Sequence, residues 1–148
     1  MSYTRLLYHL VFSTKERRPL LTGELGRRTI EYIGGTLRQL KGDLLAAGVA
    51  ADHLHLGIAA HPQVAVSDLV GKVKSASSGW IHKTFPQAGR FAWQDGYSAF
   101  SVSPSVMGRV KRYIQGQAEH HKKVSFQEEL IALLRRHGIE YDERYIWA

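Results

Sequence analysis

The chain has 148 residues, of which 44% are hydrophobic and 22% charged, and it contains no cysteine. This composition is typical of a globular protein with a core of its own, so we expect residues 1–148 to form a single domain. The absence of cysteine excludes a disulfide-stabilised scaffold and a thiolate metal site. Because no apolar run approaches the roughly 20 residues of a membrane span and no signal-peptide pattern is present, we expect a cytoplasmic protein without a membrane partner.

Basic residues are concentrated in the middle of the chain. The formal net charge is +7, and residues 72–123 hold nine basic and two acidic side chains. Such a segment indicates a polyanionic partner, because lysine and arginine neutralise phosphates and release their counterions. The alternative is a solvated basic surface. Charge alone favours nucleic acid over that alternative.

The first half of the chain contains three strand patterns and one helix pattern. Residues 3–13 alternate in polarity, which predicts a strand packed on one side. Apolar residues recur at helical spacing over 23–41, which predicts a helix. The segments 44–49 and 53–60 are typical of two short strands joined by a turn.

The second half adds helices and β-prone aromatic segments. Ser67 is a plausible N-cap for a second helix, and the segments 91–93 and 97–102 together favour one or two more strands. Ser103 followed by proline predicts a third helix through about residue 120. A fourth helix is expected to begin at a capping box at Ser125 and to end before Gly138.

The order of these elements predicts the fold class. The sequence β-α-β-β-α-β-α is typical of an α+β, ferredoxin-like sandwich, in which an antiparallel sheet carries helices on one face. The tail at 139–148 is amphipathic and is expected to pack against a partner.

Two histidines lie two positions apart in the predicted strand 53–60. Side chains at that spacing share one face of a strand, so His53 and His55 project together while Leu54 enters the core. Two convergent imidazoles form half of a divalent-metal site. A chance pair of histidines on a polar strand face is the alternative.

A tyrosine and a glutamine lie four positions apart in the third predicted helix. Tyr113 and Gln117 therefore share one helix face, and the amide oxygen of Gln117 could complete a ligand triad with the two histidines. A phenol beside a divalent cation is deprotonated more easily than a free one and can act as a nucleophile. The alternative is an ordinary amphipathic helix with Tyr113 half-buried.

A further set of basic and hydroxyl side chains is of the types that commonly contact phosphate groups. Lysine and arginine supply charge, and serine hydroxyls donate hydrogen bonds. The neighbouring His120-His121 pair either contacts phosphate or marks a helix end. The candidate DNA-binding residues are Lys72, Lys74, Ser75, Ser78, Arg109, Arg112 and Lys122.

An ordered set of short motifs spans nearly the whole chain. They are Val11-Phe12-Ser13-Thr14-Lys15, Asp52-His53-Leu54-His55, Lys74-Ser75 with Ser77-Ser78, Trp93-Gln94-Asp95-Gly96-Tyr97, Ser101-Val102-Ser103, Tyr113-Ile114 with Gln117, His120-His121-Lys122, Glu128-Glu129 and Tyr145-Ile146-Trp147. Together they resemble the single-tyrosine HUH transposases of small insertion sequences, which include repeat-associated tyrosine transposases.

The resemblance implies a role for each matching residue. His53 and His55 match the histidines that bind a divalent cation, Mg²⁺ or Mn²⁺, and Gln117 matches the third ligand. Tyr113 matches the nucleophile that cleaves single-stranded DNA at hairpin-bearing ends, leaving a 5′-phosphotyrosine and a free 3′-hydroxyl. The family acts as a homodimer whose sheets join edge to edge, with each site completed by the partner's tyrosine helix. It needs no nucleotide cofactor, because the phosphotyrosine conserves the phosphodiester energy.

Three other functions remain open at this point. A relaxase or replication-initiator nickase would use the same chemistry, although those enzymes usually carry further domains. A non-catalytic module that binds single-stranded nucleic acid would use only the basic segment and the aromatic residues. A small metal-dependent hydrolase would release free products without a protein–DNA bond.

Overall fold

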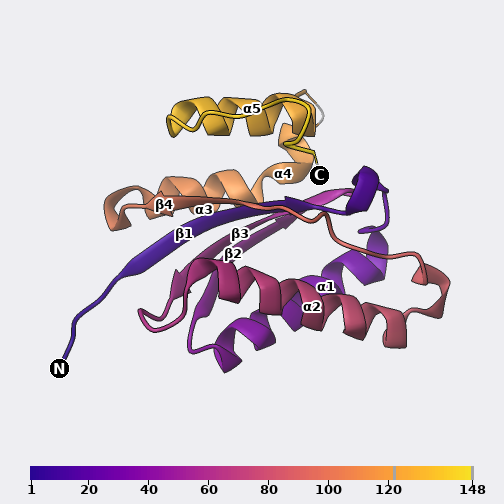
Figure 1. Ribbon diagram of the computed structural model, residues 1–148, viewed down its shortest axis with the longest axis horizontal. Helices are drawn as coiled ribbons and strands as arrows, with labels where there is room; N and C mark the ends of the chain where they lie inside the picture. Colours follow the sequence, from indigo (N-terminus) through magenta and orange to yellow (C-terminus); the bar gives the residue numbers. More distant parts are fainter. Residues whose placement is uncertain (122, 148) are drawn as a thin grey trace.

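Four antiparallel strands form one sheet in the order β2-β3-β1-β4 (Figure 1). The computed structural model describes residues 1–121 and 123–147. With one helix between β1 and β2 and another between β3 and β4, the arrangement is β-α-β-β-α-β. The predicted α+β fold with an antiparallel sheet is confirmed. The strands are β1 (Leu6–Ser13), β2 (Asp43–Val49), β3 (His53–Ala60) and β4 (Ser98–Val102).

Two long helices, α1 (Gly23–Gln39) and α2 (Val66–Thr84), cover one face of the sheet. Alternate strand residues point into the core beneath them, and Leu10, Leu54 and Leu56 are fully buried there. The alternation predicted for the strands therefore holds on this face, because burying every second side chain removes apolar surface from water.

The opposite face also carries helices, which is where the structure departs from the predicted one-sided sandwich. α3 (Met107–Gln115), α4 (Gln117–His120) and α5 (Phe126–Arg136) all lie on that side (Figure 1). The physical reason is a second apolar cluster, in which Val11 and Phe100 of the sheet are buried against α5. Along the residues that the structure describes, no helix is long and apolar enough to cross a membrane.

Glycines let α3 lie directly on the sheet. A Cβ atom built on Gly48 of β2 would overlap the backbone carbonyl of Ile114 and lie 2.8 Å from the Gln117 side chain. At Gly57 of β3, a Cβ atom would lie 3.2 Å from the Ile114 side chain. This close approach places the tyrosine helix over β2 and β3, beside the two histidines.

Several element boundaries differ from the predictions. α2 begins at Val66 with Ala65 as its N-cap, so Ser67 lies inside the first turn, because Val66 packs against the core. The segment 91–93 forms one isolated bridge from Trp93 to Thr14 rather than a strand. The third predicted helix is split at Gly116 into α3 and α4. Short 3-10 helices are η1 (Lys15–Arg17), η2 (Pro86–Ala88) and η3 (Pro104–Val106).

The last helix begins and ends as predicted. The backbone N–H of Glu128 donates to the Ser125 hydroxyl at 3.2 Å, and Gly138 adopts a φ of +66° just after the helix. In the following tail, Tyr141, Ile146 and Trp147 pack against the apolar cluster of this same chain that includes buried residues of α5.

The contact at Gly48 predicts a specific loss of stability. Gly48→Ala forces its methyl group against the Ile114 carbonyl, so we expect the free energy of unfolding to fall by about 1–3 kcal/mol. Gly71→Ala in α2 is the control: within the described part of the chain nothing lies within 4 Å of its added Cβ, and the change should raise stability by up to about 1 kcal/mol. Urea unfolding measures both. Equal stability of Gly48→Ala and wild type would contradict the predicted close approach.

Candidate active site

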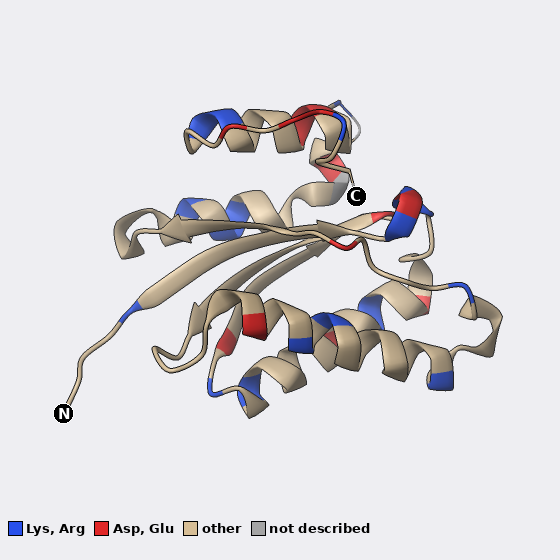
Figure 2. Cartoon of the chain, in the orientation of Figure 1, with Lys and Arg blue, Asp and Glu red and all other residues tan. Residues whose placement is uncertain are grey.

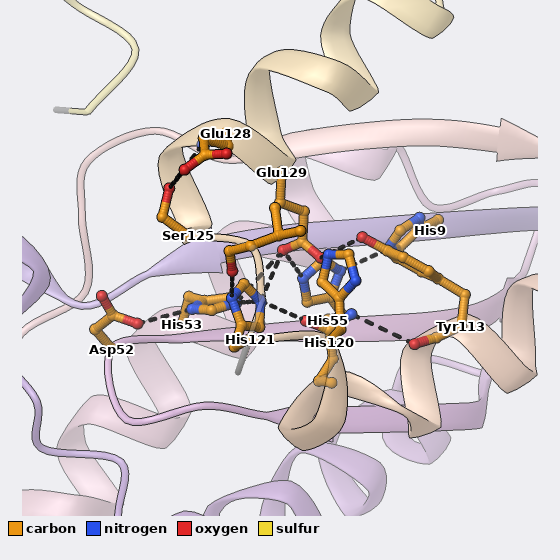
Figure 3. Close-up of polar contacts among 12 residues, drawn as sticks. His9, Asp52, His53, His55, Tyr113, His120, His121, Ser125, Glu128 and Glu129 are labelled. Carbon is orange, nitrogen blue, oxygen red and sulfur yellow. Dashed lines mark hydrogen bonds and ion pairs between the residues drawn. The ribbon is translucent and has the colours of Figure 1, made fainter.

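β3 carries two histidines on the face of the sheet that α3 and α5 cover. The rings of His53 and His55 lie 5.3 Å apart (Figure 3). Leu54, between them in the strand, enters the opposite core. This shared face is the one that the spacing predicts. Both imidazoles are almost completely buried, at 1% and 0% exposure, rather than lying on a solvated polar face.

A buried carboxylate from α5 joins these histidines. Glu129 Oε1 lies 2.8 Å from His55 Nε2 and 3.6 Å from His53 Nε2. His121 Nε2 lies 3.1 Å from the same oxygen. Three imidazole nitrogens therefore surround one carboxylate oxygen of a side chain that is 3% exposed.

The tyrosine reaches the other oxygen of that carboxylate. Tyr113 of α3 donates its hydroxyl hydrogen to Glu129 Oε2 in a short hydrogen bond, and its ring lies 5.8 Å from the His55 ring (Figure 3). His120 Nε2 is 3.0 Å from the same Oε2. In this structure one chain suffices to bring Tyr113 beside the histidines.

Gln117 lies next to the histidine cluster. Its side chain is 1% exposed, and its Oε1 is 2.8 Å from His121 Nε2. That same nitrogen is 3.0 Å from His53 Nε2. The predicted third ligand thus contacts His121, which in turn lies beside His53 and is itself a candidate ligand.

The cluster has the composition of a divalent-metal site. Ligand atoms of His53, His55, His121 and Glu129 all lie within 4.8 Å of one another. Imidazole nitrogens with one carboxylate oxygen suit a transition ion such as Mn²⁺ better than Mg²⁺, which prefers oxygen ligands. One anionic oxygen among buried imidazoles also gives a cation a compensating charge. The residues therefore fit the metal that the sequence predicts.

Hydrogen bonds to two carboxylates set the charge of this site. Burial by itself lowers the pKa of His53, but hydrogen bonds with Asp52, at 2.8 Å, and with Glu129 outweigh burial and raise the pKa. For His55, burial dominates and the pKa is lowered. Burial opposes ionisation of Glu129, but hydrogen bonds from His53 and His55 hold its pKa far below the ordinary range. Glu129 is therefore an anion.

The phenol is held in its protonated form by its surroundings. Burial, followed by the hydrogen bond to the Glu129 carboxylate, raises the pKa of Tyr113 well above its usual value of 10.0. A carboxylate that accepts the phenolic hydrogen stabilises the neutral phenol. Tyr113 is therefore a neutral phenol in this arrangement.

A third histidine supports the pair from β1. His9 Nε2 lies 2.8 Å from His55 Nδ1, the ring nitrogen that faces away from Glu129. Burial, followed by the nearby charge of His55, lowers the pKa of His9 to about 3. His9 is thus neutral and fixes the tautomer and ring orientation of His55, in the way that outer hydrogen-bond partners orient metal ligands.

The site also holds four residues that the sequence did not place there: Glu129, His121, His9 and Asp52. His121 stood out only as one of an ambiguous histidine pair, and Glu129 only as part of a motif in the family resemblance. His9 alternates onto the correct face of β1, but its partner is decided by strand pairing, which sets His9 opposite Gly57. No pattern among the residues near His9 in the sequence predicts which strand β1 pairs with.

The predicted DNA-binding residues divide between the two faces. Arg109 and Arg112 lie on α3 with Tyr113, whereas Lys72, Ser75 and Ser78 lie on α2 across the sheet. Figure 2 shows basic residues on both helices. Lys122 lies outside the described residues.

Lys74, also on α2, has a role within the fold. Its ammonium group donates to the carbonyl oxygens of Gln94, Asp95 and Gly96, the first at 2.9 Å. Burial lowers the pKa of Lys74 to about 8. The side chain thus pins the loop that precedes β4 rather than projecting freely towards a phosphate.

Comparison with known proteins identifies the family. Residues 2–117 match the family described as "Transposase IS200 like". The chain belongs to this family. The transposase is 29% identical over 118 residues to the ISDra2 transposase TnpA of Deinococcus radiodurans, covering 76% of this chain and 84% of that protein. It is 31% identical over 124 residues to the transposase for insertion sequence element IS200 of Salmonella typhimurium, covering 78% of each.

Solved structures share the fold of this transposase. A crystal structure of a candidate transposase from Deinococcus radiodurans aligns with a TM-score of 0.66 and 28% identity, covering 76% of this chain and 91% of that one. A REP-associated tyrosine transposase bound to a REP hairpin aligns with a TM-score of 0.63 and 14% identity, covering 84% of this chain and 73% of that one. Membership of the family makes this protein a DNA-processing enzyme.

The low pKa of His9 predicts how the stability of the metal-free transposase depends on pH. Between the ordinary value of 6.5 and about 3, the unfolded chain binds a proton at His9 that the folded chain does not. Stability therefore falls as the pH falls through this window. His9→Leu removes that difference, so we expect its stability to decline less steeply, by up to about 1.4 kcal/mol per pH unit. Urea unfolding in chelator checks this, and parallel curves for the two proteins would contradict it.

Proposed function

We propose that this protein is a metal-dependent transposase that cleaves and rejoins single-stranded DNA at hairpin-bearing element ends through a 5′-phosphotyrosine intermediate. One observation carries the proposal: the Tyr113 hydroxyl and the imidazoles of His53 and His55 meet on the same buried Glu129 carboxylate. Phosphoryl transfer by a tyrosine requires the nucleophile to lie close to the ligands that would hold the metal. Tyr113 and the two histidines meet this requirement.

Tyr113 carries the covalent step. Its phenolic oxygen loses its proton as it forms a bond to phosphorus, and the bond from phosphorus to the 3′-oxygen of the neighbouring nucleotide breaks. That oxygen takes up a proton and becomes a free 3′-hydroxyl. Rejoining is the reverse reaction, in which a 3′-hydroxyl attacks the phosphotyrosine and returns the phenol. The number of phosphodiester bonds is conserved, so no nucleotide cofactor is required.

The histidine cluster would hold the cation. We assign His53 and His55 as ligands with Gln117 as the third, and Glu129 and His121 as the alternative third ligands at the distances given above. A bound Mg²⁺ or Mn²⁺ would polarise a non-bridging phosphate oxygen and offset the charge that develops there. His9 and Asp52 orient the two imidazoles through the ring nitrogens that face away from Glu129.

Two basic surfaces would hold the DNA. Arg109 and Arg112 share α3 with Tyr113, so we assign them to the strand that is cleaved. Lys72, Ser75 and Ser78 lie on α2, and we assign them to a separate part of the substrate, such as the hairpin stem. One solved relative is bound to a REP hairpin, which supports a hairpin substrate here.

A homodimer is also proposed. β2 and β4 are the two edge strands of the sheet, and an edge strand presents backbone N–H and C=O groups that a second copy can pair with. A dimer supplies two tyrosines, and excision with rejoining requires two cleavages. Completion of each site by the partner's tyrosine helix would need α3 to leave the position that it occupies here.

The same geometry serves a relaxase or replication-initiator nickase, but the curated relatives described above are transposases, which favours transposition. A non-catalytic module that binds single-stranded nucleic acid would need no buried cluster of three histidines and a carboxylate beside a tyrosine. That cluster supports the enzyme over the binding module.

Covalent capture tests the nucleophile. The protein is incubated with single-stranded hairpin DNAs from the flanks of its own gene and Mn²⁺, then denatured and examined for DNA-linked protein. We expect a linked band with wild type and none with Tyr113→Phe, because phenylalanine has no oxygen to attack phosphorus. Tyr8→Phe on the opposite face of β1 is the matched control and should retain the band. Tight single-strand binding without any adduct would instead favour the binding module.

Metal binding tests the ligand set. Electron paramagnetic resonance of free Mn²⁺ gives the affinity of each variant. We expect His53→Ala and His55→Ala to lose binding, and Gln117→Ala to weaken it by about tenfold or more. His61→Ala, in the turn after β3, should bind as wild type does. A larger loss in Glu129→Gln than in Gln117→Ala would transfer the oxygen ligand to Glu129.

A further inference from the structure

A cavity opens beside Tyr113, between α3, α5 and the sheet. Its volume is about 410 Å³, which lies within the usual range of ligand pockets, about 300–1,000 Å³. Three valines and a leucine form part of its wall: Val102 at the end of β4, Val106 at the end of η3, Val110 on α3, and Leu133 on α5. The lining that these residues provide suits a flat apolar group.

The cavity is positively charged. Arg109 from α3 and Arg136 from α5 both line it, and the basic residues on these two helices are visible in Figure 2. Among the residues that the structure describes, no aspartate or glutamate lines this cavity. The occupant that fits is therefore an apolar body attached to an anion.

The cavity is continuous with the candidate active site. Tyr113 and His9 both line it, and these are the residues that contact Glu129 and His55. A DNA strand whose phosphate reaches the Tyr113 hydroxyl therefore brings its neighbouring nucleotide to the entrance of the cavity.

An aromatic surface lies at the same place. His137, just after α5, stacks on Phe100 of β4 with ring centroids 4.3 Å apart and an interplanar angle of 23°. His137 is solvent-exposed, whereas Phe100 is buried. The outer face of the imidazole is thus available to an unpaired nucleobase, which stacks on rings of this kind.

We propose that this cavity receives the unpaired base of the nucleotide next to the phosphate that Tyr113 attacks. The proposal rests on the proposed function and adds a site for one nucleotide. The valine and leucine side chains contact the base through van der Waals packing, which does not depend on the identity of the base, so we expect the cavity to accept different bases and to bind an abasic position weakly. Arg109 and Arg136 hold the phosphates of that nucleotide.

Nucleotide binding without catalysis is the first test. The methyl signals of Val102, Val106, Val110 and Leu133 are followed by NMR during titration of the full chain with dAMP and then with dTMP. We expect both to shift these methyls, and deoxyribose 5-phosphate, which has no base, to leave them nearly unchanged. Equal shifts from the sugar phosphate, or none from either nucleotide, would overturn the proposal.

Variants locate the binding in the cavity. Arg136→Ala should weaken dAMP binding by about tenfold, whereas Arg135→Ala, the adjacent exposed arginine outside the cavity, should leave it unchanged. Val106→Trp fills the space and should abolish the shifts at the remaining methyls, provided that its thermal unfolding matches wild type. If Val106→Trp does not fold, the comparison of dAMP affinity between Arg136→Ala and Arg135→Ala tests the proposal instead. Equal losses in the two arginine variants would assign the binding to general charge and overturn the proposal.

Abasic scanning links the cavity to the reaction. Single abasic sites are placed along a cleaved oligonucleotide, and the rate of covalent adduct formation is measured. We expect one position next to the cleaved phosphate to lose about tenfold, while exchanging its base for another has little effect. A uniform response at every position would overturn the proposal. If wild type forms no adduct at all, the proposed function fails. The NMR titration still shows whether the cavity binds a nucleotide.

Discussion

The buried carboxylate of Glu129 is the interaction on which the site depends. A carboxylate in an apolar interior is costly unless hydrogen-bond donors surround it. Here His55 and Tyr113 contact its two oxygens, and His121 adds a third contact. These contacts tie α5, α3 and β3 to one another. Removing the carboxylate would leave several buried polar groups without their partner.

Apolar packing places that carboxylate. Leu130 and Leu133, next to Glu129 on α5, are buried with Val11 and Phe100 of the sheet. The helix therefore docks through its hydrophobic stripe and carries Glu129 into the histidines. Once water is excluded, the electrostatic interactions between the carboxylate, the imidazoles and any bound cation become stronger. The cavity beside Tyr113 is lined by residues of both α3 and α5.

Small residues set the position of the tyrosine helix. Without a side chain at Gly48, the backbone of α3 at Ile114 lies against β2, and Tyr113 follows it to the histidine face. Gly116 then ends α3, and the chain restarts as α4, which buries Gln117 and brings His121 beside His53. A continuous helix would follow a different path beyond residue 116.

Local periodicity determined much of this protein from the sequence alone. Alternation in β3 set His53 and His55 on one face and Leu54 on the other, and helical spacing set Tyr113 and Gln117 one turn apart. The capping residues of α5 and the β-α-β-β-α-β order were also predictable, because each depends on neighbouring residues. These features rest on backbone geometry, which repeats every two or 3.6 residues.

Tertiary structure alone decided which of these groups meet. Glu129 lies 74 residues from His55 along the chain, and His9 lies 46 residues from it on the other side. Their contacts arise from strand pairing and from the docking of α5, which follow from burying apolar surface across the whole molecule. No spacing within the sequence encodes them. The sequence therefore determined the chemical groups available, and packing decided that a glutamate, three histidines and a tyrosine share one buried site.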